Sequence, residues 1–329
     1  MQPIAILLAA SALGLALAPP LSGDRDTGER PAGTLVFLSS GNLLTSVDVA
    51  SGRRTVRRIR GIPSCAPDLQ VTGGRVVFAG VRKQRTVVFS IPIGLDRPPK
   101  LLGAAHAYVP SATEGRVWLA GVDCDRSRMV GVREVTVDGR TTMSSHRPVP
   151  RGWLTGAVDT GLVLWRSSHR KHATVVWNPR TGRTSGALNL EAVIDTRGQL
   201  MAGCVVQTRC RRLAILDRDR GRSTVARPPA PFKLDSAATL SPDGSLLAAP
   251  ASSNRSWRMA LVNTRDGTTT IVPGSATGKT YPVQRWSSSG GWLFFRSGRN
   301  RLMAYRQGEP RAIPLPFKWP HKAVAYVAG

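Results

Sequence analysis

Four cysteines are the residues whose spacing predicts the most definite chemistry in this chain, the formation of disulfide bonds. Cys204 and Cys210 flank Val-Val-Gln-Thr-Arg, so a bond between them closes a short loop at a hairpin tip. Cys65 and Cys124 lie in predicted loops of two neighbouring strand-rich units, and a bond between them joins the units. By chain entropy the short bridge contributes roughly 2 kcal/mol and the long one roughly 4 kcal/mol. Zinc is the alternative, but no C-x-x-C spacing supports it, so we expect no metal site.

The other residue types that could do chemistry do not form a catalytic pattern. His169 and His172 lie three residues apart, but the two cations between them would repel a metal ion, which favours a solvated loop. Residues 274–280 match a phosphate loop only in part, because Pro273 occupies the position of its first glycine. A strand is predicted over 281–286, where a phosphate loop needs a helix. With no G-x-S-x-G sequence either, we predict no catalytic residue and no cofactor.

The charge balance is strongly basic, with 46 Lys plus Arg against 20 Asp plus Glu and a net charge of +26. An arginine excess also arises from GC-rich coding, so a solvated basic surface is one interpretation. An anionic envelope partner, such as an acidic cell-wall polymer or lipid headgroups, is the second, because a field of one sign attracts the opposite charge. No recognition helix or aromatic and basic motif supports nucleic acid. Two clusters are dense: Arg53, Arg54, Arg57, Arg58 and Arg60, and Arg209, Arg211 and Arg212.

Recurring turns indicate which elements position these residues. An Asn or Asp is followed four residues later by Gly at four places, each between two hydrophobic strands. An Asx side chain binds nearby backbone amides, and Gly accepts the positive φ of a tight hairpin. The four pairs are Asp48 with Gly52, Asn178 with Gly182, Asp217 with Gly221, and Asn263 with Gly267.

A second series of glycines precedes apolar runs such as Val76-Val77-Phe78, at intervals of roughly 37 to 47 residues. These runs are nearly continuous, as expected for strands buried on both faces between adjacent sheets. The spacing predicts an all-β fold, a seven-bladed β-propeller of four-stranded antiparallel blades, with six or eight blades as alternatives. The expected blades cover residues 34–61, 67–104, 106–149, 154–190, 191–228, 235–273 and 282–315. The first has three strands, and we expect the tail 321–327 to supply its innermost strand, so that the two chain ends pair.

One repeat carries a family resemblance. The segment Ser241-Pro242-Asp243-Gly244-Ser245-Leu246-Leu247-Ala248 resembles the S-P-D-G-x-x-[LI]-[AV] repeat of TolB-like propellers, a PD40-type, WD40-like family of exported bacterial proteins. Ser287-Ser288-Ser289-Gly290 is a degenerate second copy, and Asp195-Thr196-Arg197-Gly198 keeps the outline. The resemblance implies a tight turn between the two inner strands of a blade, an extracytoplasmic location and a role in binding envelope proteins. TolB itself has six blades and an extra N-terminal domain, so no binding residue is transferred.

The N-terminus predicts export. Residues 4–18 form an apolar run that is too short for a comfortable membrane span but typical of a signal peptide, and Ala16-Leu17-Ala18 ends it as A-x-A. No Lys or Arg precedes the run and Pro19 would hinder signal peptidase, so an uncleaved anchor is the alternative. We therefore expect a signal peptide or anchor over 1–18, a polar linker over 19–31 and one propeller domain over 32–329.

These features predict a secreted or envelope-tethered binding module, monomeric, with an envelope protein or anionic envelope polymer as its partner and no nucleic acid. The expected site is the central mouth on the face that carries the interblade loops and the cysteines. A propeller-type hydrolase or lyase, active on a lactone or a glycan, is the alternative. Such an enzyme needs carboxylates, His or a metal at the mouth of the channel.

Overall fold

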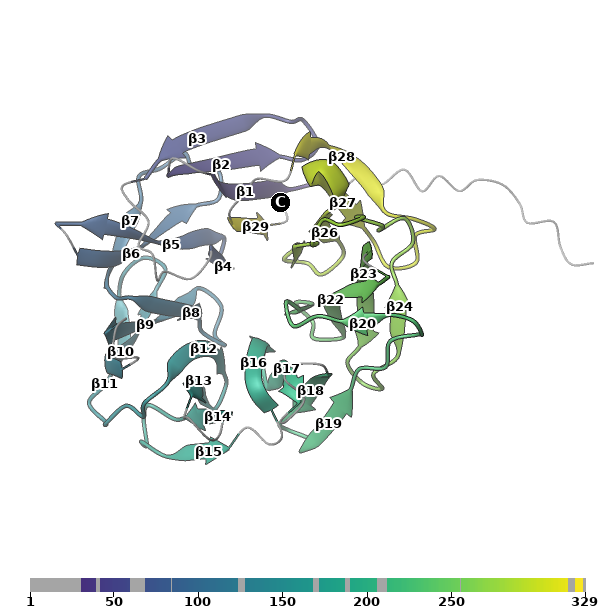
Figure 1. Ribbon diagram of the computed structural model, residues 1–329. Coiled ribbons are helices and arrows are strands. Elements are labelled where there is room, and N and C mark those ends of the chain that lie inside the picture. The colour runs from purple at the N-terminus through teal and green to yellow at the C-terminus, as the bar shows by residue number, and fades with distance from the viewer. Residues whose placement is uncertain are drawn as a thin grey trace, which may run out of the picture. The chain divides into compact units, whose positions relative to one another are not determined.

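Seven antiparallel sheets stand around a central axis and form a β-propeller (Figure 1). The computed structural model describes residues 31–39, 42–59, 69–83, 85–123, 128–167, 172–186, 190–205, 212–254, 256–318 and 323–327. We number the sheets as blades 1 to 7 and call the strand positions A to D from the axis outwards. Strands are given in the order A to D. Blade 1 contains β29 (Ala323–Val327), β1 (Thr34–Ser39), β2 (Leu43–Asp48) and β3 (Arg54–Arg58), and blade 2 contains β4 (Gln70–Thr72), β5 (Arg75–Arg82), β6 (Arg85–Pro92) and β7 (Lys100–Ala104). Blade 3 contains β8 (Ala107–Pro110), β9 (Arg116–Asp123), β10 (Arg128–Thr136) and β11 (Thr141–Ser145), and blade 4 contains β12 (Trp153–Val158), β13 (Gly161–Ser167), β14 (His172–Trp177) and β15 (Thr184–Gly186).

The last three blades follow the same order, with one addition in blade 6, where two short strands share position A. Blade 5 contains β16 (Leu190–Arg197), β17 (Leu200–Val205), β18 (Leu213–Asp217) and β19 (Arg222–Val225). Blade 6 contains β20 (Lys233–Leu234), β21 (Thr239–Leu240), β22 (Leu246–Ser253), β23 (Ser256–Asn263) and β24 (Thr269–Ile271). Blade 7 contains β25 (Gln284–Trp286), β26 (Leu293–Arg296), β27 (Arg301–Tyr305) and β28 (Ile313–Lys318), with a 3-10 helix η1 (Gly298–Asn300). None of the described helices is long and apolar enough to cross a membrane.

The ring closes through its two ends, as the sequence predicted. β29 supplies strand A of blade 1 and pairs antiparallel with β1, from Thr34 opposite Val327 to Leu38 opposite Ala323. A strand edge that would otherwise offer unpaired backbone groups is thereby covered. The predicted count of seven antiparallel blades is confirmed; six of them have the four predicted strands, and blade 6 has a fifth.

The core lies between blades and not within a single sheet. Each of the seven clusters of buried hydrophobic residues joins two neighbouring blades. On β5, for example, Val76 packs toward blade 1 and Val77 toward blade 3, and both are 0% exposed. Successive side chains of a strand point to opposite faces, so a blade that is covered on both sides needs an uninterrupted apolar run. This explains why strands B and C read as continuous hydrophobic segments.

The four Asx and Gly pairs form the turns between strands C and D. In the first, the Gly52 amide donates to the Asp48 carbonyl at 2.9 Å, and the Ser51 amide donates to the Asp48 carboxylate at 2.7 Å. Asn178 and Gly182 repeat both kinds of contact, and all four glycines have positive φ. The outer strand of one blade then rests on the next such turn, where Ser145 Oγ donates to the Pro179 carbonyl at 2.8 Å.

Two of these glycines should respond differently to a methyl group. A Cβ on Gly267 would lie 2.2 Å from the Val225 carbonyl oxygen, whereas a Cβ on Gly221 meets nothing within 4 Å. Both have left-handed φ, of +79° and +59°. We expect Gly221→Ala to cost about 1 kcal/mol, from the backbone conformation alone, and Gly267→Ala about 2 kcal/mol or more, because the interblade contact must also open. Urea unfolding of the two variants measures this difference, and equal costs would contradict the packing of Gly267 against blade 5.

The resemblance to the TolB-like repeat corresponds to real turns between strands A and B. Ser241 Oγ donates to the Asp243 carboxylate at 2.6 Å, Asp243 also accepts from Ser245, and Gly244 has a φ of +72°. In the degenerate copy Ser289 takes the place of Asp243 and contacts Ser287 Oγ at 3.2 Å. The glycine with left-handed backbone conformation there is Gly290, with a φ of +77°. Gly291, which directly precedes the apolar run 292–295, does not have a positive φ.

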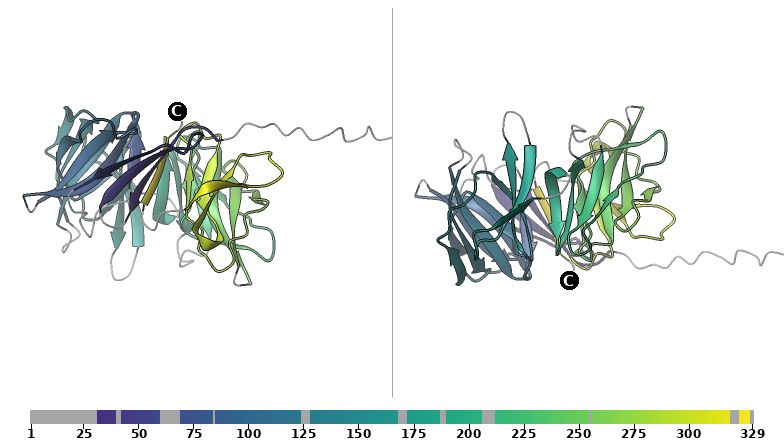
Figure 2. Two further views of the ribbon diagram at one scale, coloured as in Figure 1. Left: turned by 90° about the horizontal axis from the view of Figure 1, so that it is seen from above. Right: turned by 90° about the horizontal axis from the view of Figure 1, so that it is seen from below.

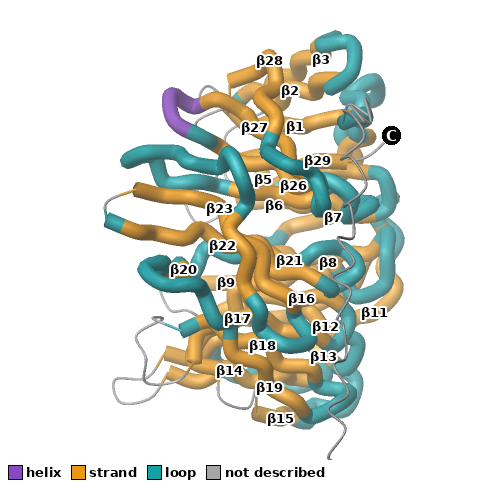
Figure 3. Tube along the Cα trace, turned by 90° about the vertical axis from the view of Figure 1, so that its right-hand side faces the viewer, coloured by secondary structure: helices purple, strands orange, loops and turns teal. Residues whose placement is uncertain are grey.

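The alternation of strands gives the ring two unlike faces. The turns that join A to B and C to D lie on one face, which we call the turn face; the B to C hairpins and the interblade loops lie on the other, the loop face. Figure 2 shows the ring from two sides, and in Figure 3 the helix η1 marks the loop face on the left.

Candidate functional site

Acidic side chains are sorted between the two faces. Among carboxylates whose side chains the structure describes, Glu191 and Asp235 lie toward the loop face, and the others lie at or next to turns of the turn face. Those others are Asp48, Asp96, Glu114, Glu134, Asp138, Asp159, Asp195, Asp217, Asp219, Asp243, Asp266 and Glu309. Arginines accompany them, with at least one exposed in each C to D turn. The turn face therefore carries charges of both signs.

Turn chemistry explains why the acids gather there. A side-chain hydrogen bond from Ser51, followed by one from its amide, lowers the pKa of Asp48, and the amide of Thr268 does the same for Asp266. Burial opposes ionisation of Asp243, but hydrogen bonds from Ser241 and Ser245 outweigh it and lower the pKa. These carboxylates serve as acceptors for their own turns.

Asp195 of blade 5 accepts hydrogen bonds from the neighbouring blade 6. Its Oδ2 receives the Thr239 hydroxyl at 3.0 Å and the Leu240 amide at 2.8 Å, so blade 5 holds strand A of blade 6.

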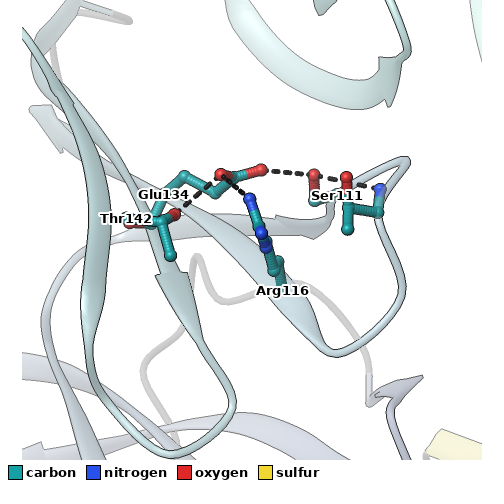
Figure 4. A network of polar contacts seen from close by, with 5 residues as sticks. Ser111, Arg116, Glu134 and Thr142 are labelled. Atoms are coloured by element: carbon teal, nitrogen blue, oxygen red, sulfur yellow. Dashed lines mark hydrogen bonds and ion pairs between the residues drawn. The ribbon is translucent and has the colours of Figure 1, made fainter.

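Glu134, the most buried of the described carboxylates, belongs to a polar network at a cleft between blades 3 and 4 (Figure 4). It is 5% exposed, and its Oε1 accepts from Ser111 Oγ at 2.6 Å. Its Oε2 accepts from Thr142 Oγ1 at 2.7 Å and from the Arg116 guanidinium at 3.3 Å. Burial opposes ionisation, but the hydrogen bonds from Ser111, Thr142 and Arg116 prevail and hold the pKa of Glu134 below its ordinary value. The network positions the A to B turn and Arg116.

The cleft beside this network has a volume of about 380 Å³. Trp118 and Met143 contribute apolar lining, while Asp159 and Arg180 contribute opposite charges from blade 4. Because Glu134 is already bonded to three partners, it is suited to holding the cleft wall and not to transferring protons.

On the loop face, by contrast, the described residues include many exposed cations and two carboxylates. Asp235 is one of its two described carboxylates, and its Oδ1 already accepts the Tyr281 hydroxyl at 2.5 Å and the Ala237 amide at 3.1 Å. Arg212 from the second predicted arginine cluster is exposed on this face, whereas Arg54 and Arg58 from the first are exposed on the outermost strand β3. Among the described residues, the exposed cations at or near the loop face include Arg82, Lys83, Arg85, Arg151, Arg166, Arg212, Lys233, Arg258, Lys279, Arg301 and Lys318.

Blade 6 is elaborated on this face. Residues 235–238 separate β20 from β21, and both strands pair with β22. The long loop before β25 folds against the B to C hairpin, where the Trp257 amide donates to the Gly278 carbonyl at 2.9 Å. Trp257 and Tyr281 meet edge to face with ring centres 4.8 Å apart. Three half-buried aromatic rings, Phe232, Trp257 and Tyr281, thus lie among the loop-face cations.

The structure places some of the cysteines, histidines and loop residues that the sequence analysis considered as candidate sites. Cys204 is the second-last residue of β17, near the loop face, and is 2% exposed. Cys65, Cys124 and Cys210 lie outside the described residues, so both pairings stay predictions. His169 also lies outside them, and His172 begins β14. Residues 274–280 belong to an interblade loop, as expected, although the following strand begins at Gln284 and not at 281. Among described residues, no three His, Cys, Asp or Glu side chains gather as metal ligands.

Sequence reasoning missed the contacts that join blades. Tyr281 to Asp235 and Thr239 to Asp195 each link residues separated by about one repeat, 46 and 44 positions. Polar pairs at the repeat spacing were the available signal, because equivalent positions of neighbouring blades lie side by side.

The sequence matches no protein-family model and no curated protein. Among solved structures, an oligogalacturonate lyase from Vibrio parahaemolyticus is similar with a TM-score of 0.56 and 11% identity, covering 86% of each chain. A functionally unknown protein from Desulfotomaculum acetoxidans has a TM-score of 0.53 at 11% identity, over 90% of this chain and 99% of that one. TolB from Acinetobacter baumannii has a TM-score of 0.50 at 12% identity, over 88% and 79%. At these identities the likeness shows the propeller fold alone.

Proposed function

We propose that this chain is a binding module of the cell envelope whose loop face recognises an anionic partner. One observation carries the proposal: among the side chains that the structure describes, most carboxylates lie on the turn face, several of them as hydrogen-bond acceptors, and only two lie beside the cations of the loop face. A surface of one sign raises the local concentration of opposite charge and speeds association. The apolar N-terminal run supports placement outside the cytoplasm.

The carboxylates themselves support binding over catalysis. Glu134, Asp195, Asp235 and Asp243 each accept hydrogen bonds from neighbouring turns or strands, which is a structural task. A hydrolase requires an acid and a base that face the substrate with their proton-transfer capacity free.

Replacing loop-face charge tests the proposal. Residues 31–329 contain the closed ring and all seven cores, so this part serves as the test protein. A variant with Arg82, Lys83, Arg85, Arg166 and Arg212 changed to Gln should bind soluble polyphosphate and polygalacturonate at least about tenfold more weakly at low salt. Isothermal titration measures the loss.

The matched control removes the same charge from the turn face through Arg53, Arg97, Arg140, Arg220 and Arg265. We expect its affinity to stay within about threefold of the parent, since these cations have carboxylates beside them. Equal losses in both variants would show that net charge alone governs binding and would overturn the assignment to the loop face.

A further inference from the structure

We infer that blade 6 holds the specific part of the loop face, a site for an acidic polysaccharide in which the aromatic rings pack against sugar and the cations bind its acid groups. This inference rests on the proposed function and names the partner class. Blade 6 differs from the other blades: it has an extra strand, β20, and it is followed by a long interblade loop over residues 272–283.

The loop of blade 6 is fixed in place before any ligand arrives. The Thr277 amide donates to the Trp257 carbonyl at 2.9 Å, returning the bond from Trp257 to Gly278. Arg296 donates to the Tyr281 carbonyl through Nε at 3.1 Å and Nη2 at 2.6 Å. Buried Ser275 adds a bond to the Val272 carbonyl at 2.6 Å and accepts from the Met259 amide. A surface held this way loses little conformational entropy on binding.

The aromatic rings give this region an apolar component beside its exposed cations. Trp257 and Tyr281 pack edge to face with an interplanar angle of 68°. The Tyr281 hydroxyl also donates a hydrogen bond to Asp235, which lies between β20 and β21. The Arg258 guanidinium lies 5.8 Å from the centre of the Phe232 ring. Rings of this kind bury area against the C–H surface of a ligand while polar atoms remain wet.

The charges around the rings are cationic. Lys233, Arg258 and Lys279 are exposed, and Asp235 is committed to Tyr281 and to the Ala237 amide. Guanidinium and ammonium groups bind carboxylate and phosphate with charge-assisted hydrogen bonds. A ligand that offers both an apolar ring face and repeated acid groups matches this set, and an acidic polysaccharide has that composition.

The ring geometry distinguishes this partner from single-stranded nucleic acid. Stacking successive bases uses aromatic faces that follow the strand, whereas Trp257 and Tyr281 are inclined to each other and locked by contacts within the loop. A site that presents one ring face beside separate cations suits a sugar residue flanked by acid groups.

The test uses polygalacturonate as the acidic polysaccharide, with polyphosphate, dextran and single-stranded DNA as comparison ligands. For Arg258→Gln with Lys279→Gln, we expect about a tenfold loss of polygalacturonate affinity. For Phe232→Leu, we expect about a fivefold loss with polygalacturonate and a change within about twofold with polyphosphate, which has no ring to pack. The turn-face pair Arg220→Gln with Arg265→Gln is the charge-matched control and should be unchanged, and thermal unfolding checks that each variant is folded.

The outcomes separate the two proposals. If the five loop-face substitutions weaken polyanion binding but the blade 6 variants do not, the site on blade 6 is wrong and the basic loop face stands. If neither set matters, both fail. Tighter binding of single-stranded DNA that depends on Phe232 would overturn the polysaccharide assignment in favour of nucleic acid, and equal binding of dextran would remove the role of the cations.

Discussion

Deleting residues 323–329 should lower the free energy of unfolding by about 4 to 5 kcal/mol, since the backbone bonds of β29 to β1 contribute about 1 kcal/mol each. The deletion removes strand A of blade 1, whose register with β1 spans Thr34 to Leu38. It also leaves the inner edge of β1 unpaired, where another chain can add. A folded domain is stable by only about 5 to 15 kcal/mol, so this loss is a large share of the total.

Urea unfolding followed by tryptophan fluorescence measures the effect, with size-exclusion chromatography to detect association through the open edge. The control deletes Ala328 and Gly329 alone, which follow β29 in the chain. We expect the control to unfold like the parent. A long deletion that leaves the unfolding midpoint unchanged would show that the ring does not depend on closure by the tail.

Replacing Glu134 should produce the second large effect. Glu134→Ala removes the acceptor of Ser111, Thr142 and Arg116 in a nearly closed site, and we expect a cost of about 3 kcal/mol at neutral pH. Glu114→Ala is the matched control, because Glu114 is an exposed carboxylate of the turn between β8 and β9, which also contains Ser111. Its free energy of unfolding should stay within about 0.5 kcal/mol of the parent.

The effect of Glu134 should also depend on pH in one direction. Its folded pKa lies below the ordinary value of 4.5, so the unfolded chain takes up the proton first as pH falls. The stabilisation by the carboxylate is therefore complete above about pH 5 and is lost as pH falls through the folded pKa. The gap in unfolding free energy between the parent and Glu134→Gln should narrow toward pH 3. A gap that widens on acidification would contradict the ionised network.

The fold could be predicted from sequence because its strongest constraints are local. Gly52 and Gly182 reveal their turns through the Asx residue four positions earlier, and Val76-Val77-Phe78 shows a strand covered on both sides without reference to any other part of the chain. The tail could be assigned to β1 because blade 1 otherwise had only three strands. The turns and strands are recognised from residues within a single hairpin, and the place of the tail follows from the number of strands in blade 1.

The candidate sites could not be predicted in the same way. Glu134 lies on β10 in an ordinary strand sequence, and its partners come from a turn and from two other strands. The pairing of Trp257 with Tyr281 depends on how one long loop folds back on a hairpin. The division of charge between the two faces could be recognised only once the strand directions were known. The face on which an acidic residue lies depends on which connection between strands contains it.

The entry point of the first blade has a mechanical consequence. β1 starts at Thr34 on the turn face, so any preceding segment of chain is joined there. A pull on that segment is borne by β1, which is held between β29 and β2 by backbone bonds on both sides. Because force along a strand loads several hydrogen bonds together, the attachment at β1 can carry load without opening the sheet one bond at a time.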